Sequence, residues 1–272
     1  MNCKTLVCLT IVFLIFCPGV GAEENIHGSF LIENYDSVQI RDYFHNFYRI
    51  PVSAGEEIFY PDEGGRQRNH KVLGALMGSF ILDQFIRDFT REYIYSGDNL
   101  LSRFLYNVGT TDTVLLGFGG SFAWSRVSED IYLEDTMLLS LQSLILTQLT
   151  TEVLKNTVKR VRPRNSPNDP FTRSSGSQSF ISGHTSGTWA VMSVIAGRYP
   201  QKKMFAYGLA TAVSVARIYE DAHWLSDVLA GAIVGYGFGR LTLDLNNSFE
   251  RKLSLSPVIY EQGAGLYVSY QF

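Results

Sequence analysis

Three short polar clusters in the second half of the chain carry residue types suited to phosphate chemistry. In chain order they contain Lys155 and Arg162, then Ser182, Gly183 and His184, and then Arg217, His223 and Asp227. Together they supply three cations, two histidines and one carboxylate. This inventory is suited to binding a phosphoryl group and attacking it with a histidine.

The first cluster is expected at the end of a long helix. Apolar periodicity predicts a helix over residues 130–161, which Pro163 then stops. Lys155 and Arg162 are seven positions apart, close to two helical turns, so their side chains should point the same way. Arg162 offers a planar fork to two phosphate oxygens, whereas Lys155 is a mobile point charge.

The second cluster is expected at the start of a helix. Small residues lead into the apolar run 189–196, so Ser182, Gly183 and His184 should lie at a helix N-terminus. The free backbone N–H groups of such a terminus, together with the Ser182 hydroxyl, form an anion site.

The third cluster pairs a histidine with a carboxylate. His223 and Asp227 are four residues apart at the start of a helix expected over 224–241, so one face should carry both. The carboxylate can accept a hydrogen bond from one ring nitrogen and leave the other nitrogen facing a substrate. Taken singly, each cluster is more simply a solvated helix end, a turn or a packed histidine. Their order, with a helix between each pair, favours a shared site.

In this order the clusters resemble the signature of the type 2 phosphatidic acid phosphatase superfamily, which includes bacterial class A acid phosphatases and vanadium haloperoxidases. The resemblance covers roughly residues 70 to 241 and rests on KNTVKRVRP, SFISGHTS and ARIYEDAHWLSD. Two positions depart from the family pattern, which usually has Pro at Ile181 and Ser at Ala216. Neither position contributes a required charge, so the departures concern loop shape more than chemistry.

The resemblance implies catalytic roles for three residues. His223 would be the nucleophile and form a phosphohistidine, and Asp227 would orient it and raise its basicity. His184 would protonate the leaving oxygen and then activate water.

The resemblance also implies a phosphate-binding set made of Lys155, Arg162, Ser182, Gly183 and Arg217. The cations and the Gly183 N–H would neutralise the phosphoryl oxygens, so the reaction would need neither a metal nor another cofactor. Vanadate could bind as a phosphate mimic.

The first 22 residues have the pattern of an export signal, with Lys4, the apolar stretch 6–16 and a small-residue cleavage site at 20–22. An uncleaved anchor, or a lipoprotein modified at Cys17, is less favoured. All three cysteines lie within this segment, so the mature chain would contain no disulfide, no thiol chemistry and no Cys-based metal site. Without Lys4, 22 basic and 26 acidic residues remain, a net charge of −4 that gives no overall attraction to nucleic acid.

The predicted fold is mainly α, a compact bundle of about six to seven helices. Its segments are an export signal over 1–22, an irregular N-terminal arm over 23–69, a helical domain over 70–245 and a C-terminal β-hairpin over 246–272. The apolar periodicity predicts helices over residues 70–95, 98–108, 111–126, 130–161, 185–197, 202–218 and 224–241.

The mature chain lacks long charge-free runs. The longest, Thr136–Thr151, has 16 residues, whereas a membrane span needs about 20, so buried helices of a bundle are favoured. Peripheral membrane contact remains an alternative. The alternation of Leu266, Val268, Tyr270 and Phe272 resembles a final outer-membrane strand, but one hairpin cannot make a barrel, so association with the outer membrane is the less favoured alternative.

These observations predict an exported phosphatase of the bacterial periplasm or envelope, acting on a phosphomonoester or pyrophosphate, with a lipid phosphate favoured over a soluble small molecule. No nucleic-acid partner is expected. The alternatives are a vanadium-dependent haloperoxidase, which uses the same pocket, and a non-catalytic envelope binding protein.

Overall fold

The computed structural model describes residues 40–95, 110–174, 178–260 and 263–270, together with residues 100, 103, 104, 107 and 176. The described part is mainly helical, with seven α-helices, which confirms the predicted class. The export signal, the first part of the N-terminal arm and most of the predicted helix 98–108 lie outside the described residues.

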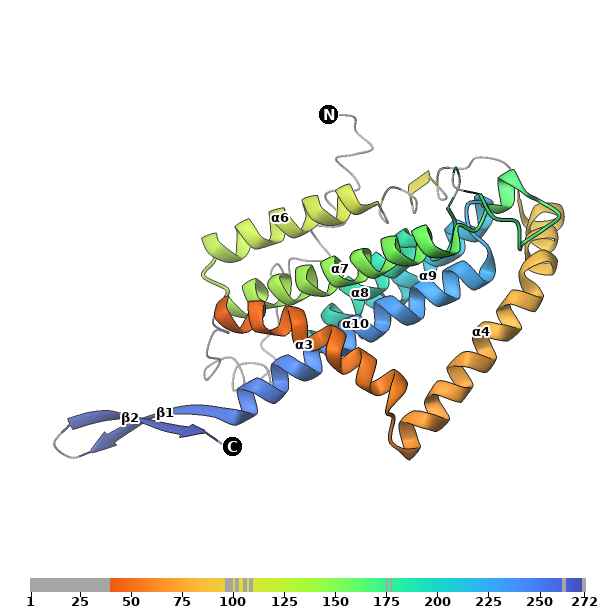
Figure 1. The fold of residues 1–272 in the computed structure, drawn as a ribbon. Coiled ribbons are helices and arrows are strands. Elements are labelled where there is room, and N and C mark those ends of the chain that lie inside the picture. Colours follow the sequence, from red (N-terminus) through yellow and green to blue (C-terminus); the bar gives the residue numbers. More distant parts are fainter. Residues whose placement is uncertain are drawn as a thin grey trace.

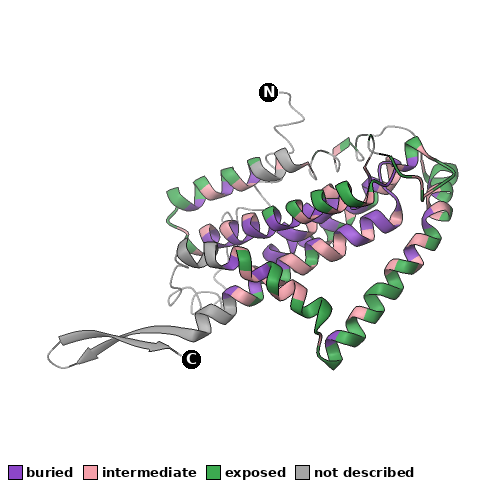
Figure 2. Cartoon of the chain, in the orientation of Figure 1, coloured by how far each residue is buried: buried purple, intermediate pink, exposed green. Residues whose placement is uncertain are grey.

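Four helices form the centre of the molecule: α7 (Ile131–Val158), α8 (Gly183–Arg198), α9 (Lys203–Tyr219) and α10 (Leu225–Lys252). Helix α8 packs against the other three, and buried residues concentrate in these helices (Figures 1 and 2). Its polar start therefore lies where α7, α9 and α10 can all contribute side chains.

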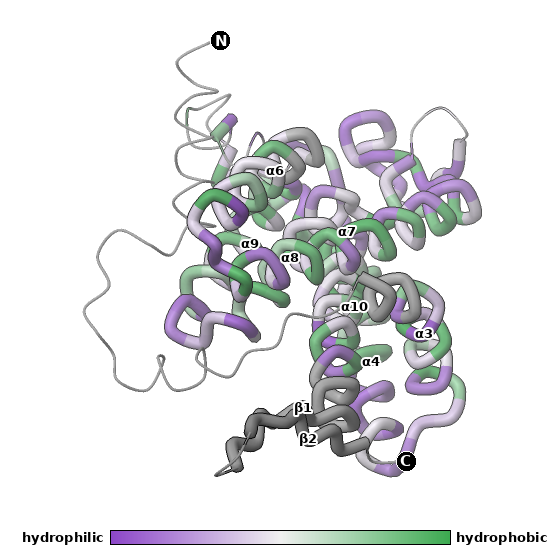
Figure 3. The backbone as a smooth tube through the Cα atoms, turned by 90° about the vertical axis from the view of Figure 1, so that its left-hand side faces the viewer, coloured by the Kyte–Doolittle hydropathy of each residue, from purple (hydrophilic) through white to green (hydrophobic). Residues whose placement is uncertain are grey.

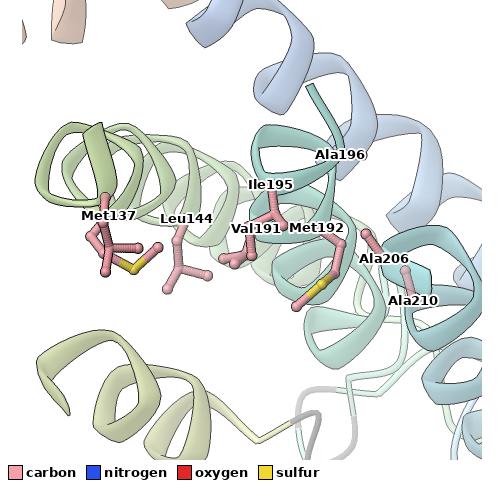
Figure 4. Packing of buried hydrophobic residues seen from close by; sticks show 9 residues of the cluster. Met137, Leu144, Val191, Met192, Ile195, Ala196, Ala206 and Ala210 are labelled. Atoms are coloured by element: carbon pink, nitrogen blue, oxygen red, sulfur yellow. The ribbon is translucent and has the colours of Figure 1, made fainter. Parts of the chain in front are cut away.

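The main apolar cluster joins α7, α8 and α9. It contains Leu133, Met137 and Leu144 of α7 together with a row of small and medium side chains on α8 and α9, among them Val191, Ile195 and Ala206 (Figure 4). Helix α6 (Thr111–Val127) lies along α7 and is connected to it by a short turn, after which Asp130 caps α7 by accepting from the Leu133 N–H at 2.9 Å.

Three glycines of α10 let its backbone approach α8 closely. Cβ atoms added at Gly231 and Gly239 would lie 2.9 Å from the Ser182 carbonyl oxygen and 2.8 Å from that of Ala190, and one added at Gly235 would overlap the Ser186 carbonyl. Because the three glycines recur every fourth residue, they form one smooth stripe. This stripe brings the start of α8 against the start of α10.

The predicted irregular arm is wrong for residues 40–69. Helix α3 (Ile40–Phe59) occupies most of this stretch, with Pro51 inside it, and α4 (Glu63–Phe89) begins after Asp62, which accepts from the Gly65 N–H at 2.6 Å. Helix α3 is held by packing on α10 and α7, and its Ile50 is fully buried, so tertiary contacts offset the breaker residues.

Helices α3 and α4 diverge in a V, and α4 then returns to the bundle through its C-terminal half (Figure 1). A short π-helical turn, η1 (Thr90–Ile94), extends α4, and both arms of the V are mostly exposed (Figure 2).

The end of the chain follows α10 directly. The strands β1 (Leu253–Tyr260) and β2 (Gly263–Tyr270) are drawn as an antiparallel pair, but their side chains lie outside the described residues. The C-terminal β-hairpin therefore stays a prediction. The short 3-10 turns η2 (Pro163–Asn165) and η3 (Pro200–Lys202) complete the described elements.

Two helices of the described part are long and apolar enough to cross a membrane, namely α7 and residues 225–246 of α10. The charge-free runs in the sequence are shorter than these helices, because charged residues lie near the ends of both. In the most apolar stretches of these helices, 50% of the α7 residues and 39% of the α10 residues are buried inside the bundle. Hydropathy on these helices is mapped in Figure 3.

Candidate active site

The second cluster lies at a helix N-terminus, as predicted. Ser182 is the N-cap of α8, and Gly183 and His184 begin its first turn. The buried Ser182 hydroxyl accepts a hydrogen bond from the Thr185 hydroxyl at 3.0 Å, and its backbone N–H donates to the Asp227 carbonyl at 3.1 Å. The second and third clusters are therefore joined through the backbone.

Lys155 reaches the same helix start from the last turn of α7. Its Nζ would lie 3.3 Å from a Cβ added at Gly183, so only a glycine leaves full room for the ammonium here. The same Nζ donates to Glu152 at 3.0 Å, and Gln148 of α7 donates to the Gly183 carbonyl at 3.1 Å. The first and second clusters are thus in contact.

Arg162 does not lie on the helix that carries Lys155, and that prediction is wrong. Helix α7 ends at Val158 because Lys159 takes a left-handed conformation, with φ of 54°, and donates its N–H to the Lys155 carbonyl. Arg162 follows in extended backbone, just before η2. The loop, and not two turns of helix, aims its guanidinium.

Arg217 comes from the last turn of α9. Its side chain is buried and forms an ion pair with Glu220 one turn later. The Arg217 carbonyl accepts hydrogen bonds from the Ala222 and His223 N–H groups at 3.2 and 3.3 Å, which fixes the turn before His223.

His223 precedes α10, and Asp227 lies in its first turn. Both side chains are buried, and Nδ1 of His223 is 3.7 Å from Oδ2 of Asp227, a separation longer than a hydrogen bond. Burial lowers the pKa of His223, as do Arg162 and Arg217, while Asp227 opposes the shift. The result is a neutral imidazole at neutral pH.

His184 lies among the cations of all three clusters. Its pKa is lowered to about 3, first by burial and then by the charges of Arg217, His223, Lys155 and Arg162. Because these four groups all act electrostatically on His184, both histidines and the three cations lie within interaction range of one another near the start of α8.

Sequence reasoning missed Arg160 and Asp83. Arg160 lies in the basic run 159–164 and is buried, where it forms ion pairs with Asp83 of α4 at 2.5 Å and with Asp227 at 2.6 Å. A signal was present for Asp83, because it is a single carboxylate in the apolar stretch 80–86 of a predicted helix. Such a residue, when buried, needs a cationic partner.

A hollow of about 680 Å³ lies elsewhere, at the turn between α3 and α4. It is lined by residues 58–61 and by Arg66, Asn69, His70 and Leu73, none of them a predicted site residue. Among the residues that the structure describes, no three His, Cys, Asp or Glu side chains gather so as to hold a metal ion. Independence from metal stays a prediction.

A helical bundle with three cations and two histidines around one helix N-terminus has the features of a phosphate-binding protein. Residues 136–250 match the family model of the PAP2 superfamily, the family that the three clusters resemble. Phosphatase is the enzyme class that the match supports.

Among solved structures, the chain is similar to a transmembrane PAP2-type phosphatidylglycerolphosphate phosphatase from Bacillus subtilis. The two share 20% sequence identity with a TM-score of 0.49, over 77% of this chain and 96% of the other. No curated protein matches the chain.

Proposed function

We propose that this protein is an exported phosphatase that hydrolyses a phosphomonoester or pyrophosphate through a phosphohistidine, without a metal ion. The observation that carries the proposal is the gathering of both histidines and three cations at the start of α8. A phosphoryl group in transfer spreads negative charge over its oxygens, and fixed positive charge stabilises that state most.

In the first step His223 attacks phosphorus. Its lowered pKa leaves the ring neutral, so Nε2 carries a lone pair, and Asp227 on the Nδ1 side favours the positive charge that develops. The N–P bond forms while the bond from phosphorus to the leaving oxygen breaks, and His184 gives that oxygen a proton.

In the second step water attacks phosphorus and His184 takes the water proton. The N–P bond breaks, inorganic phosphate leaves, and His223 returns to its neutral form. His184 can hold a proton only when a bound phosphate offsets the cations around it, so we infer that His184 is protonated together with substrate binding.

The cations divide the binding of the phosphoryl oxygens. Lys155 lies beside Gly183, whose N–H begins α8, and Arg217 and Arg162 act on both histidines from α9 and from the loop after α7. With the Ser182 hydroxyl and the Gly183 N–H, these groups surround the place that a phosphoryl group would take.

The outer face of α4 supports a lipid phosphate as the substrate. Apolar side chains recur every fourth residue there and in η1, which extends the helix, and they are 44% to 80% exposed. We call this set the α4 ridge, and it consists of Leu73, Met77, Ile81, Phe85, Phe89 and Tyr93. The opposite face buries Ser79 and Asp83, so the helix exposes its apolar side and buries a charge. A lipid surface is the partner that such a ridge fits.

The same helix connects the ridge to the site. Gln84 and Arg87 both donate to the Pro167 carbonyl at 3.0 Å, and Arg87 holds Asp221, two residues before His223, through both carboxylate oxygens. A membrane bound at the ridge would therefore lie near the loops that carry Pro167 and Asp221, which border the candidate active site. Export to the periplasm rests on the predicted signal 1–22, and peripheral contact with an envelope membrane follows from the ridge.

The test is phosphate release by the chain from Glu23 onward, with EDTA present. The substrates are p-nitrophenyl phosphate, phosphatidate and a prenyl pyrophosphate. We expect release that EDTA does not affect, faster turnover of a lipid substrate, and no turnover by His223→Ala. Trapping of acid-labile, base-stable phosphate on the wild type but not on His223→Ala identifies the intermediate.

Three results would contradict the proposal. Near-normal turnover by His223→Ala removes the phosphohistidine. Loss of activity with EDTA, restored by a divalent metal, removes the metal-independent scheme. Absence of release by a folded protein that instead oxidises bromide with vanadate and peroxide identifies a haloperoxidase.

A further inference from the structure

A buried network outside the predicted site reaches its carboxylate. Arg160 donates from Nη1 to Oδ1 of Asp227 at 2.6 Å and from Nη2 to Oδ2 of Asp83 at 2.5 Å. The side chains are 4%, 0% and 0% exposed for Arg160, Asp83 and Asp227. Asp83 lies on α4, outside the segment that matches the PAP2 superfamily.

The Arg160 guanidinium is held on every side. Nη1 also donates to the Ser226 hydroxyl at 2.6 Å and Nε to the Pro170 carbonyl at 2.7 Å, while the rings of Phe80 and Trp224 lie 5.1 and 5.3 Å from Cζ. A planar fork fixed in this way places Oδ1 of Asp227 with little freedom.

Asp83 holds the first turn of α10 as well. Its Oδ1 accepts from the Ser226 N–H at 2.8 Å and its Oδ2 from the Ser226 hydroxyl at 2.6 Å. Since Asp227 is the next residue, Asp83 fixes the backbone that carries it. The backbone N–H of Trp224 donates to Oδ2 of Asp227 at 2.9 Å, so both carboxylate oxygens of Asp227 are held by hydrogen bonds.

The charges along the network alternate. Burial raises the pKa of Asp83, and the hydrogen bonds from Arg160 and Ser226 oppose that shift by favouring its ionised form. Arg160 alone would neutralise Asp227 and weaken its action on His223, whereas ionised Asp83 balances Arg160 and leaves a net negative charge at Asp227. That charge is what stabilises the cation formed when His223 attacks phosphorus.

We propose that Asp83 and Arg160 are positioning residues that hold Asp227 in place and keep its negative charge available to His223. Helix α4 thereby completes the active site from outside the family segment. This inference rests on the proposed function for its effect on turnover, but not for its effect on His223 itself.

The alternative is that the network only stabilises the fold, and Asp83→Asn separates the two. The substitution keeps the shape of the side chain and removes one negative charge. The positive charge of Arg160 then disfavours protonated His223 more strongly, so the pKa of His223 should fall. The other charged groups that act on His223, namely Asp227, Arg162, Arg217 and His184, are unchanged. A purely structural role would lower the active fraction without moving the titration.

The measurement is the titration of His223 by NMR in protein with labelled histidine, assigned through His223→Asn, together with the pH dependence of kcat and KM for p-nitrophenyl phosphate. We expect Asp83→Asn to move the His223 titration and the acid limb of kcat/KM to lower pH. We also expect kcat to fall roughly tenfold to a hundredfold with little change in KM, as for groups that orient a catalytic partner.

A double variant that restores the net charge of the network completes the test. Asp83→Asn combined with Arg160→Gln again leaves one net negative charge, so the His223 titration should return toward that of the wild type. Arg160→Lys keeps the charge but loses the fork, so kcat should fall while the titration stays in place.

An unmoved His223 titration in folded Asp83→Asn overturns the inference, and so does a titration that the double variant does not restore. If Asp83→Asn does not fold, Arg160→Lys decides: unchanged kcat overturns the positioning role. If the wild type has no turnover at all, the proposed function fails, but the NMR titration still tests the coupling.

Discussion

At the residue scale, His184 and His223 are both kept neutral but for different physical reasons. His223 is the more deeply buried, and Asp227 favours its charged form. His184 has cations from three segments around it, and these cations lower its pKa together with burial. Attack on phosphorus suits the first environment, and exchange of a proton that arrives with an anion suits the second.

The pKa of His184 makes the stability of the fold depend on pH. Between its ordinary pKa of 6.5 and its folded value of about 3, the unfolded chain binds a proton that the folded protein does not. The free energy of unfolding therefore falls as the pH drops below 6.5. Relative to high pH, His184 lowers it by about 2 kcal/mol at pH 5.

His184→Asn removes this penalty. In thermal melts at pH 7, 6 and 5, the Tm of the variant minus that of the wild type should become more positive as the pH falls. His70→Asn, which removes an exposed histidine of α4, is the control and should follow the wild type. A constant Tm difference between His184→Asn and the wild type would mean that His184 takes up its proton in the folded protein.

At the scale of elements, the glycine stripe of α10 positions the site, because it brings the start of α8 against Asp227. Gly235→Ala places a methyl group against the Ser186 carbonyl and should destabilise the protein by about 1–3 kcal/mol. Gly237→Ala, on the same helix, meets no atom within 4 Å and should be neutral or stabilising by up to about 1 kcal/mol.

Chemical denaturation of both variants measures the difference directly. Because Gly235→Ala separates α8 from α10, we also expect lower kcat in the fraction that remains folded, whereas Gly237→Ala keeps wild-type kcat. Equal stability of the two variants would show that α8 and α10 pack less closely than described.

The helices that the sequence predicted well lie in long apolar stretches without an internal proline. Helix α9 was expected over 202–218 and spans Lys203–Tyr219, and α8 was expected over 185–197 and spans Gly183–Arg198. Helix α3 was missed because Pro51 and Gly55 lie inside it, and only packing on α7 and α10 offsets them. The end of α7 was misplaced because the left-handed turn at Lys159 has no signal in its residue type.

In the molecule as a whole, the contacts that join distant segments could not be predicted from the sequence. Arg160 and Asp83 are 77 residues apart, and their meeting depends on the angle at which α4 crosses the loop after α7. Periodicity gives the face of a helix but not its place against other elements. Short spacings nevertheless placed Ser182 and Gly183 at a helix start and Asp227 in the first turn after His223, whereas the seven-residue spacing from Lys155 to Arg162 misled the prediction of one helix.

The arrangement of α4 leads to the last prediction. One face of this helix holds the site through Asp83 and Arg87, and the other presents the α4 ridge to its surroundings. If the ridge rests on lipid, polar residues there should weaken membrane binding without touching the chemistry. The double variant Ile81→Gln with Phe85→Gln removes two of its most exposed apolar side chains, 80% and 64% exposed.

We expect this variant to bind phosphatidylglycerol-containing vesicles roughly tenfold or more weakly in sedimentation, because two buried apolar side chains are lost from the lipid contact. Its hydrolysis of soluble p-nitrophenyl phosphate should match the wild type, while its hydrolysis of phosphatidate in vesicles should fall with binding. Leu116→Gln with Val127→Gln on α6, 56% and 79% exposed, is the matched control and should bind as the wild type does. Equally weakened vesicle binding by both double variants would mean that lipid surrounds the whole bundle and not only α4. Unchanged vesicle binding by both would mean that the ridge does not bind lipid and would favour a protein partner there.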